Sequence, residues 1–184
     1  MIIVFCINRR GYLRLTHLVL LLGVPGAGKS TFAKQLAAQL NVPRISADTV
    51  RKNMFDNPRE HMNGTDDLKV SNVMSYITHE ILTARQSVIY DGLIESYDKR
   101  QALYVLARGT EAKCLLIELS VAEEVAMKRL APPEITQEYV DNYKQMLADF
   151  METYEPPKDP EVAIAINGDD SFGRQLETLM AATI

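Results

Sequence analysis

Short apolar runs alternate with longer stretches of mixed polarity along most of the chain. Five short runs predict buried strands, at 18–22, 44–46, 87–92, 113–119 and 162–166. Strong helix formers and apolar residues at helical spacing predict helices at 30–40, 49–55, 68–84, 96–108, 120–130, 136–154 and 171–180. Strands that alternate with helices indicate an α/β fold in which a five-stranded parallel sheet is covered by helices on both faces.

Polar and turn-forming residues predict where several of these elements begin and end. Ser96 is placed to cap the helix that follows it, and Ser120 with Glu123 has the spacing of a capping box. Turn residues between positions 56 and 66, among them Asn57-Pro58 and Asn63-Gly64, predict a loop.

The first predicted strand runs directly into a glycine-rich loop. This loop has the spacing Gly23-x-x-x-x-Gly28-Lys29-Ser30 of a phosphate-binding P-loop, and a predicted helix follows it. Glycines let successive backbone N–H groups turn inward toward phosphate oxygens, Lys29 supplies a positive charge, and the Ser30 hydroxyl can ligate Mg²⁺. We therefore expect a nucleotide to be bound by Gly23, Pro25, Gly26, Ala27, Gly28, Lys29, Ser30 and Thr31.

Two aspartates follow other predicted strands of the same sheet. Asp48 comes just after the strand at 44–46, and Asp91 ends the apolar run of the strand at 87–92. Ligands of open parallel sheets lie beyond the carboxyl ends of the strands, so both carboxylates are expected near the P-loop. Each also has a structural interpretation. Asp48 could cap its short helix with Arg51 solvated, and Asp91 could be a cap or turn residue beside Gly92.

Composition limits the remaining function classes. The 184 residues are 47% hydrophobic, which suits a single domain over residues 1–184, and the net charge of -4 gives no overall basic footprint for nucleic acid. No apolar run is long enough to span a membrane, and the start of the chain lacks the residue order of a signal peptide, so we expect a cytoplasmic protein. Residues 1–16 are either an extra strand at the N-terminus or an upstream start.

The P-loop, the run Ile45-Ser46-Ala47-Asp48-Thr49-Val50-Arg51 and the run Val88-Ile89-Tyr90-Asp91 together resemble the small P-loop kinases. The likeness is greatest to the ATP-binding kinases related to the kinase domain of phage polynucleotide kinase, with chloramphenicol phosphotransferase and gluconate kinase as more distant relatives. It covers about residues 18 to 166. It implies a P-loop NTPase fold of the nucleoside-monophosphate-kinase type with a short lid at about 130–136, and ATP and Mg²⁺ as cofactors.

The resemblance also implies roles for individual residues. Asp48 would be the base for the acceptor hydroxyl, and Arg51 would help to hold the substrate or the transferring phosphoryl group. The lid arginine Arg129 would contact the nucleotide phosphates. Lys29 would contact the nucleotide phosphates, and Ser30 and Asp91 would hold the metal.

Two departures from the family pattern stand beside these matches. Gly92-Leu93-Ile94 replaces the usual small residue, Thr and Asn, and the lid segment Ala131-Pro132-Pro133-Glu134 carries no arginine. Arg100 lies near an arginine position of the relatives, but a solvated helix face explains it equally well.

These observations favour an ATP- and Mg²⁺-dependent phosphotransferase that acts on a hydroxyl of a small molecule. A polynucleotide 5′-hydroxyl kinase is a second interpretation that the acidic composition disfavours. A nucleotide-dependent switch with little transfer activity is a third, because the lid is short and the Thr-Asn pair is missing.

Overall fold

The computed structural model describes residues 15–61, 64–131 and 135–183. Within them a single parallel sheet has the strand order β2-β3-β1-β4-β5. Its strands are β1 (His17–Leu22), β2 (Arg44–Ser46), β3 (Val88–Asp91), β4 (Lys113–Ser120) and β5 (Ala163–Asn167). The predicted five-stranded parallel sheet is confirmed, with each strand within two residues of its expected bounds.

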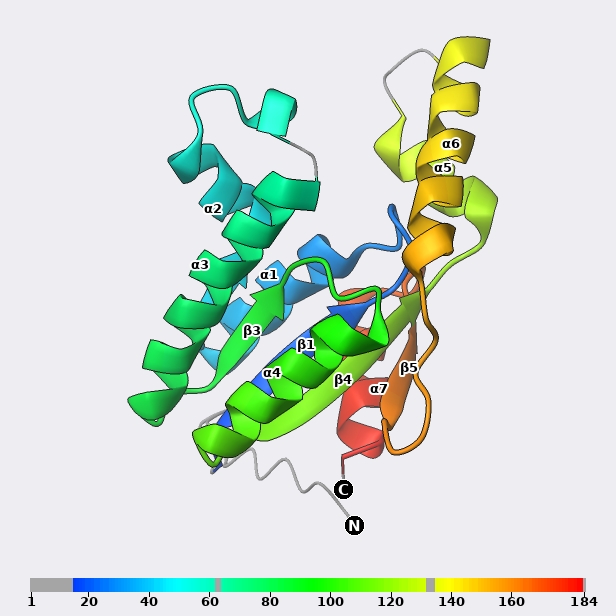
Figure 1. Ribbon diagram of the computed structural model, residues 1–184. Coiled ribbons are helices and arrows are strands. Elements are labelled where there is room, and N and C mark those ends of the chain that lie inside the picture. The colour runs from blue at the N-terminus through cyan, green and yellow to red at the C-terminus, as the bar shows by residue number, and fades with distance from the viewer. Residues whose placement is uncertain (1–14, 62–63, 132–134, 184) are drawn as a thin grey trace.

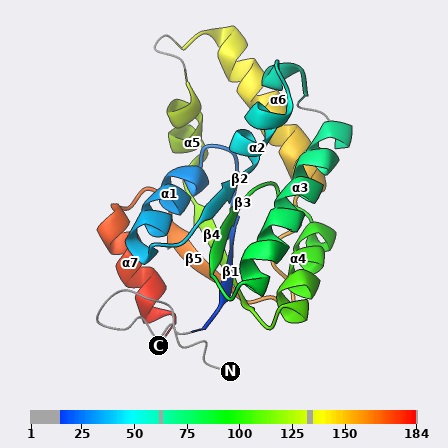
Figure 2. The same cartoon turned by 90° about the vertical axis from the view of Figure 1, so that its left-hand side faces the viewer.

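Helices cover both faces of this sheet, as Figures 1 and 2 show. Leu18, Leu20 and Leu22 of β1 point into a core formed with α3 (Gly64–Thr83) and α4 (Tyr97–Gly109). The alternate residues Val19 and Leu21 point into a second core with α1 (Lys29–Leu40) and α7 (Phe172–Ala181). Because β1 is central and both its faces are covered, its sequence is continuously apolar instead of alternating.

The other helices extend beyond the carboxyl ends of the strands. On one side of the P-loop lie α2 (Ala47–Met54) and the short 3₁₀ helix η1 (Pro58–His61). On the other side stand α5 (Glu123–Leu130) and α6 (Gln137–Thr153), which rise away from the sheet (Figure 1). The expected lid at 130–136 is the connection between α5 and α6, and its residues 132–134 lie outside the described part of the chain.

The predicted helix ends are partly right. The Ser96 hydroxyl accepts a hydrogen bond from the Lys99 amide at 3.4 Å and caps α4, as expected. The predicted capping box at Ser120 is wrong, because Ser120 still pairs with Asn167 in the sheet and α5 begins only at Glu123. The loop predicted between 56 and 66 contains η1, and α3 begins at Gly64, inside it.

No helix in the described ranges is both long and apolar enough to cross a bilayer. The expected extension at residues 1–16 falls almost wholly outside those ranges. Its last residue, Thr16, accepts a hydrogen bond from the Lys113 amide at 2.9 Å, beside the first residue of β1.

Candidate active site

At two positions the loop after β1 needs glycine for both its backbone angle and its packing. Gly23 and Gly26 have φ angles of +142° and +83°, which residues with a side chain rarely adopt. A Cβ atom would also lie 2.3 Å from the Leu119 carbonyl oxygen at Gly23, and 2.4 Å from the Ala126 carbonyl oxygen at Gly26. The loop therefore packs against the end of β4 and against α5, which sets its shape before any ligand binds.

Helix α1 begins at Lys29, directly after this loop. Among the described residues no side chain caps its first turn, so the N–H groups there and the positive end of the helix dipole are available to an anion. The Lys29 ammonium donates hydrogen bonds to the carbonyl oxygens of Gly23 at 2.6 Å and Val24 at 2.9 Å. Burial lowers the pKa of Lys29 to about 8, although the negative charges of Asp91 and Glu95 act in the opposite direction.

Ser30 and Asp91, the two expected metal ligands, meet at the end of β3. The Ser30 hydroxyl donates a hydrogen bond to Asp91 Oδ1 at 3.1 Å. A hydroxyl and a carboxylate at this separation are hard oxygen donors of the kind that Mg²⁺ prefers. Arg44, which the sequence did not single out, donates to the other oxygen, Asp91 Oδ2, through Nε at 2.9 Å and also through Nη2.

Asp48 and Arg51 lie together on α2. Ser46, not Asp48, is at the N-cap position, so the interpretation of Asp48 as a helix cap is wrong. The Asp48 side chain is 75% exposed, whereas the Arg51 side chain is only 7% exposed, which also overturns the interpretation of Arg51 as solvated. Arg51 Nη1 lies 3.5 Å from Asp48 Oδ1, and Arg51 Nη2 lies 2.5 Å from Asp67 Oδ1 on α3.

Two of the cavities that adjoin the P-loop are lined by Lys29. The larger has a volume of about 570 Å³ and is lined by residues of the loop, α1, α5 and the segment after β5: Gly26, Gly28, Lys29, Ser30, Thr31, Phe32, Gln35, Arg129, Leu130, Gly168, Asp170, Phe172 and Gln175. The smaller, of about 270 Å³, is lined by Lys29, Ser30, Ser46, Ala47, Asp48, Arg51, Asp67, Asp91, Gly92 and Leu93. Lys29 and Ser30 line both cavities, so the start of α1 is a wall that the two share.

Arg129 reaches the P-loop from the end of α5. It donates hydrogen bonds to the carbonyl oxygens of Ala27 at 3.3 Å and Gly168 at 3.0 Å, and to Asp169 Oδ1 at 3.1 Å. The structure thus places this expected lid arginine against the phosphate-binding loop.

The segment that follows β5 forms part of the larger cavity and was missed in the sequence. A Cβ atom at Gly168 would lie 2.3 Å from the Ala27 carbonyl oxygen, so glycine is needed for this contact with the P-loop. The signal that could have found this segment is its position directly after a strand, the same signal that pointed to Asp48 and Asp91.

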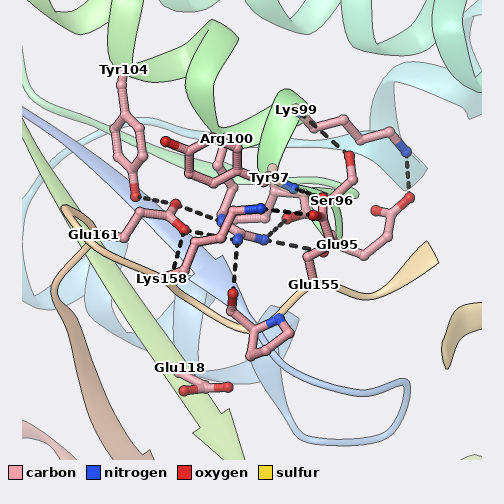
Figure 3. A network of polar contacts seen from close by, with 12 residues as sticks. Glu95, Ser96, Tyr97, Lys99, Arg100, Tyr104, Glu118, Glu155, Lys158 and Glu161 are labelled. Atoms are coloured by element: carbon pink, nitrogen blue, oxygen red, sulfur yellow. Dashed lines mark hydrogen bonds and ion pairs between the residues drawn. The ribbon is translucent and has the colours of Figure 1, made fainter. Parts of the chain in front are cut away.

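Arg100 is not solvated, and it lines neither of the two cavities at the P-loop. Its side chain is fully buried and forms a two-pronged ion pair with Glu161, with Nε–Oε1 at 2.7 Å and Nη2–Oε2 at 2.9 Å (Figure 3). It also donates to the backbone carbonyls of Ile94, Glu95 and Pro156. These contacts tie the segment between α6 and β5 to α4, so the role of Arg100 is structural.

Comparison with known proteins agrees with this geometry. A family model described as an AAA domain matches residues 18–157, from β1 through the segment after α6. The chain belongs to this family of P-loop kinases. Adenylate kinase of Mycobacterium tuberculosis strain H37Rv is 34% identical to this P-loop kinase over 123 residues, which cover 61% of the chain and 67% of the relative. Adenylate kinase of Mycobacterium marinum is 28% identical over 178 residues, covering 88% of the chain and 98% of the relative.

Solved structures share the fold of this P-loop kinase at lower identity. A gluconokinase from Sinorhizobium meliloti 1021 superposes with a TM-score of 0.68 at 19% identity, covering 92% of this chain and 93% of that one. Kti12 from Chaetomium thermophilum, in complex with ADP-AlF3, superposes with a TM-score of 0.66 at 19% identity, covering 91% of this chain and 99% of that one. The predicted fold, a P-loop NTPase of the kinase type, is confirmed.

Proposed function

We propose that the protein transfers the γ-phosphoryl group of ATP to a hydroxyl of a small molecule, with Mg²⁺. The observation that carries this proposal is the pair of cavities on either side of Lys29 and Ser30. A phosphoryl group held by the P-loop would lie between a donor in the larger cavity and an acceptor in the smaller one. The P-loop kinase family supports phosphoryl transfer in general, and the hydroxyl acceptor is our inference from the residues of the smaller cavity.

The larger cavity suits the nucleotide. Backbone N–H groups of the P-loop and the start of α1 would bind the phosphates. The partly buried Phe172, whose ring centroid lies 6.0 Å from that of the buried Phe32, offers aromatic surface to the nucleotide. Lys29 would exchange the carbonyl oxygens of Gly23 and Val24 for phosphate oxygens, which carry full negative charge. Arg129, held against Ala27 and Gly168, would offset charge on the transferring phosphoryl group.

Ser30 and Asp91 would hold Mg²⁺ at the shared wall. One hydroxyl and one carboxylate leave room for phosphate oxygens and water, which is the usual surrounding of this ion in kinases. When bound, Mg²⁺ would neutralise phosphate charge during transfer. Asp91 would first have to give up part of its pairing with Arg44.

Asp48 would act on the acceptor. Its exposed carboxylate lines the smaller cavity, so it can accept the proton of an acceptor hydroxyl. The hydroxyl oxygen would form a bond to the γ-phosphorus, the bond from that phosphorus to the β–γ bridging oxygen would break, and ADP would leave. Arg51, whose Nη1 lies 3.5 Å from Asp48 Oδ1, would orient this carboxylate toward the acceptor.

The Asp48→Asn variant tests this assignment. Release of ADP and formation of a phosphorylated product are measured with ATP and a panel of hydroxyl compounds, including AMP because two relatives are named as adenylate kinases. Transfer should fall by about 10²- to 10⁴-fold in Asp48→Asn, the usual contribution of a general base. Nucleotide affinity and melting temperature should stay close to those of the unsubstituted protein, because Asp48 neither caps α2 nor lines the nucleotide cavity.

A matched control is Asp98→Asn, which makes the same chemical change at an exposed position in the first turn of α4. Both transfer and nucleotide affinity should be unchanged in this control. Full activity in Asp48→Asn would contradict the assignment of the base. Transfer from ATP to the phosphate of AMP, with none to a hydroxyl, would contradict the hydroxyl acceptor itself.

A further inference from the structure

Asp67, on the first turn of α3, contacts the buried cation of the smaller cavity. Arg51 is 7% exposed, and its Nη2 lies 2.5 Å from Asp67 Oδ1, whereas Asp48 is 3.5 Å from Nη1. A buried guanidinium needs a counter-ion because the loss of hydration costs several kcal/mol. Asp67 is the nearer of the two carboxylates and the less exposed, at 28%. Most of the neutralisation of Arg51 is therefore due to Asp67.

The charge balance of the smaller cavity is negative on the acceptor side. Among the described residues that line it, the charged side chains are the cations Lys29 and Arg51 and the carboxylates Asp48, Asp67 and Asp91. Lys29 faces the P-loop carbonyls, and Asp91 is paired with Arg44. An acceptor would thus meet one cation, Arg51, between two carboxylates, and a negative acceptor would be repelled by both.

Arg51 nevertheless keeps one donor without a partner. Its Nε–H is buried and has no hydrogen-bond acceptor among the described residues, while Nη1 and Nη2 are directed at carboxylates. A buried donor without a partner costs about 1–3 kcal/mol, which a ligand oxygen can recover. Because this atom is buried, Arg51 would have to shift toward the cavity for a ligand to accept the bond, and a neutral hydroxyl oxygen would accept it without bringing charge toward Asp48 and Asp67.

We propose that the acceptor is an uncharged hydroxyl compound, and that Asp67 excludes anionic acceptors by neutralising Arg51. This inference rests on the proposed function of the site and adds the charge class of its substrate. A volume of about 270 Å³ suits a compound the size of one sugar ring or a short polyol, since it lies below the range of drug-sized pockets.

A binding experiment isolates the effect of Asp67 from catalysis. The protein is loaded with Mg²⁺ and a non-hydrolysable ATP analogue, so that the P-loop is filled. Inorganic phosphate is then titrated into this complex, and the heat of binding is recorded by calorimetry. The unsubstituted protein should bind phosphate at least about tenfold more weakly than Asp67→Asn, because the amide still accepts from Arg51 but no longer cancels its charge. Asp98→Asn, which removes one exposed carboxylate elsewhere, should behave like the unsubstituted protein.

Transfer assays give the second measurement. Sorbitol and gluconate differ in one terminal group, a hydroxymethyl against a carboxylate, and serve as a matched neutral and anionic pair. The ratio of kcat/KM for the anion to that for the neutral compound should rise in Asp67→Asn by about tenfold or more.

Equal phosphate affinity in the unsubstituted protein and Asp67→Asn would overturn the proposal, and so would a preference of the unsubstituted protein for the anion. If Asp67→Asn does not fold, Asp67→Ser is titrated in its place with the same expectation. The unsubstituted protein could fail to phosphorylate any hydroxyl compound and still show the expected difference in phosphate binding from Asp67→Asn. That result would contradict the proposed function while supporting the role of Asp67.

Discussion

Arg44, the first residue of β2, donates two hydrogen bonds to a single oxygen of Asp91, the last residue of β3. The carboxylate is 7% exposed and the guanidinium 23% exposed, so solvent screens this pair only in part. A cation on the carboxylate that would ligate Mg²⁺ competes with the metal for the same negative charge. Arg44 is therefore expected to set the Mg²⁺ concentration at which nucleotide binds.

The Arg44→Ala variant should need less Mg²⁺. Removing a competing interaction of about 1 kcal/mol lowers the half-saturating Mg²⁺ concentration for nucleotide binding by about fivefold. Binding of a fluorescent ATP analogue across a Mg²⁺ series measures this value, with the exposed Arg108→Ala as control. A higher Mg²⁺ requirement in Arg44→Ala would mean that Arg44 positions Asp91 for the metal instead of competing with it.

Nucleotide binding should depend on pH through Lys29. Burial lowers the pKa of this side chain to about 8, against an ordinary value of 10.5, so the free protein loses the charge as pH rises through 8. Nucleotide phosphates favour the charged form, and binding above pH 8 should therefore take up a proton and weaken as pH rises. Calorimetry at pH 8.5 in two buffers of different ionisation enthalpy measures the uptake.

Lys29→Ala serves as the comparison for this proton uptake. It should bind nucleotide far more weakly and show no uptake from this position, while melting cooperatively as a folded protein. Equal apparent binding heats in the two buffers with unsubstituted protein would show that Lys29 does not change its protonation on binding.

Arg129→Ala should slow transfer more than it weakens ground-state nucleotide binding. The guanidinium lies against the P-loop carbonyl of Ala27, where charge would develop as the phosphoryl group moves, and such interactions act mainly on the transition state. Single-turnover rates and equilibrium affinities separate the two effects. Equal losses in both would make Arg129 a residue of ground-state binding.

Among residues outside the candidate active site, we expect mutation of the buried pair Arg100 and Glu161 to cause a large loss of unfolding free energy. Arg100→Met leaves the Glu161 carboxylate buried without its partner and should cost about 3–5 kcal/mol of unfolding free energy, measured by urea denaturation. The double variant Arg100→Met/Glu161→Gln removes the uncompensated charge and should recover part of that loss. A loss below 1 kcal/mol in the single variant would contradict the structural role of the pair.

This pair also gives an acid dependence with a definite sign. Burial alone would raise the pKa of Glu161, but hydrogen bonds from Arg100, the Lys158 backbone and Tyr104 hold it below its ordinary value of 4.5. A carboxyl group whose pKa is lowered in the folded protein stabilises that protein at any pH above the ordinary pKa. This stabilisation is lost as the pH falls through the lowered pKa. Unfolding free energy should therefore fall below about pH 4.5, and it should fall less in Glu161→Gln.

Local patterns were sufficient to predict the sheet and the P-loop. The loop from Gly23 to Ser30 is contiguous, and each strand is a short apolar run, so neighbouring residues carry the whole signal. The positions of Asp48 and Asp91 followed from a general property of parallel sheets, since side chains that end adjacent strands meet at one edge. The register confirms this, because Ser46 pairs with Asp91 across β2 and β3.

Contacts between distant segments were not predictable in the same way. Arg100 and Glu161 are 61 positions apart, and Arg44 and Asp91 are 47 apart, so no local pattern of polar and apolar residues links either pair. Arg100 resembled a residue on a polar helix face because the Glu161 carboxylate that permits its burial arrives only after α6. Asp67 lies between the loop predicted at 56–66 and the helix predicted at 68–84, and its contact with Arg51 depends on how α3 packs against α2.

The shared wall formed by Lys29 and Ser30 has a consequence for the order in which substrates bind. Apart from Lys29 and Ser30 the two cavities have different lining residues, so the two substrates would occupy separate spaces. A transferase built in this way would form its ternary complex with either substrate bound first, and the phosphoryl group would pass directly between the two substrates. Initial rates measured against both substrates would then give intersecting lines, and product inhibition by ADP would be competitive toward ATP alone.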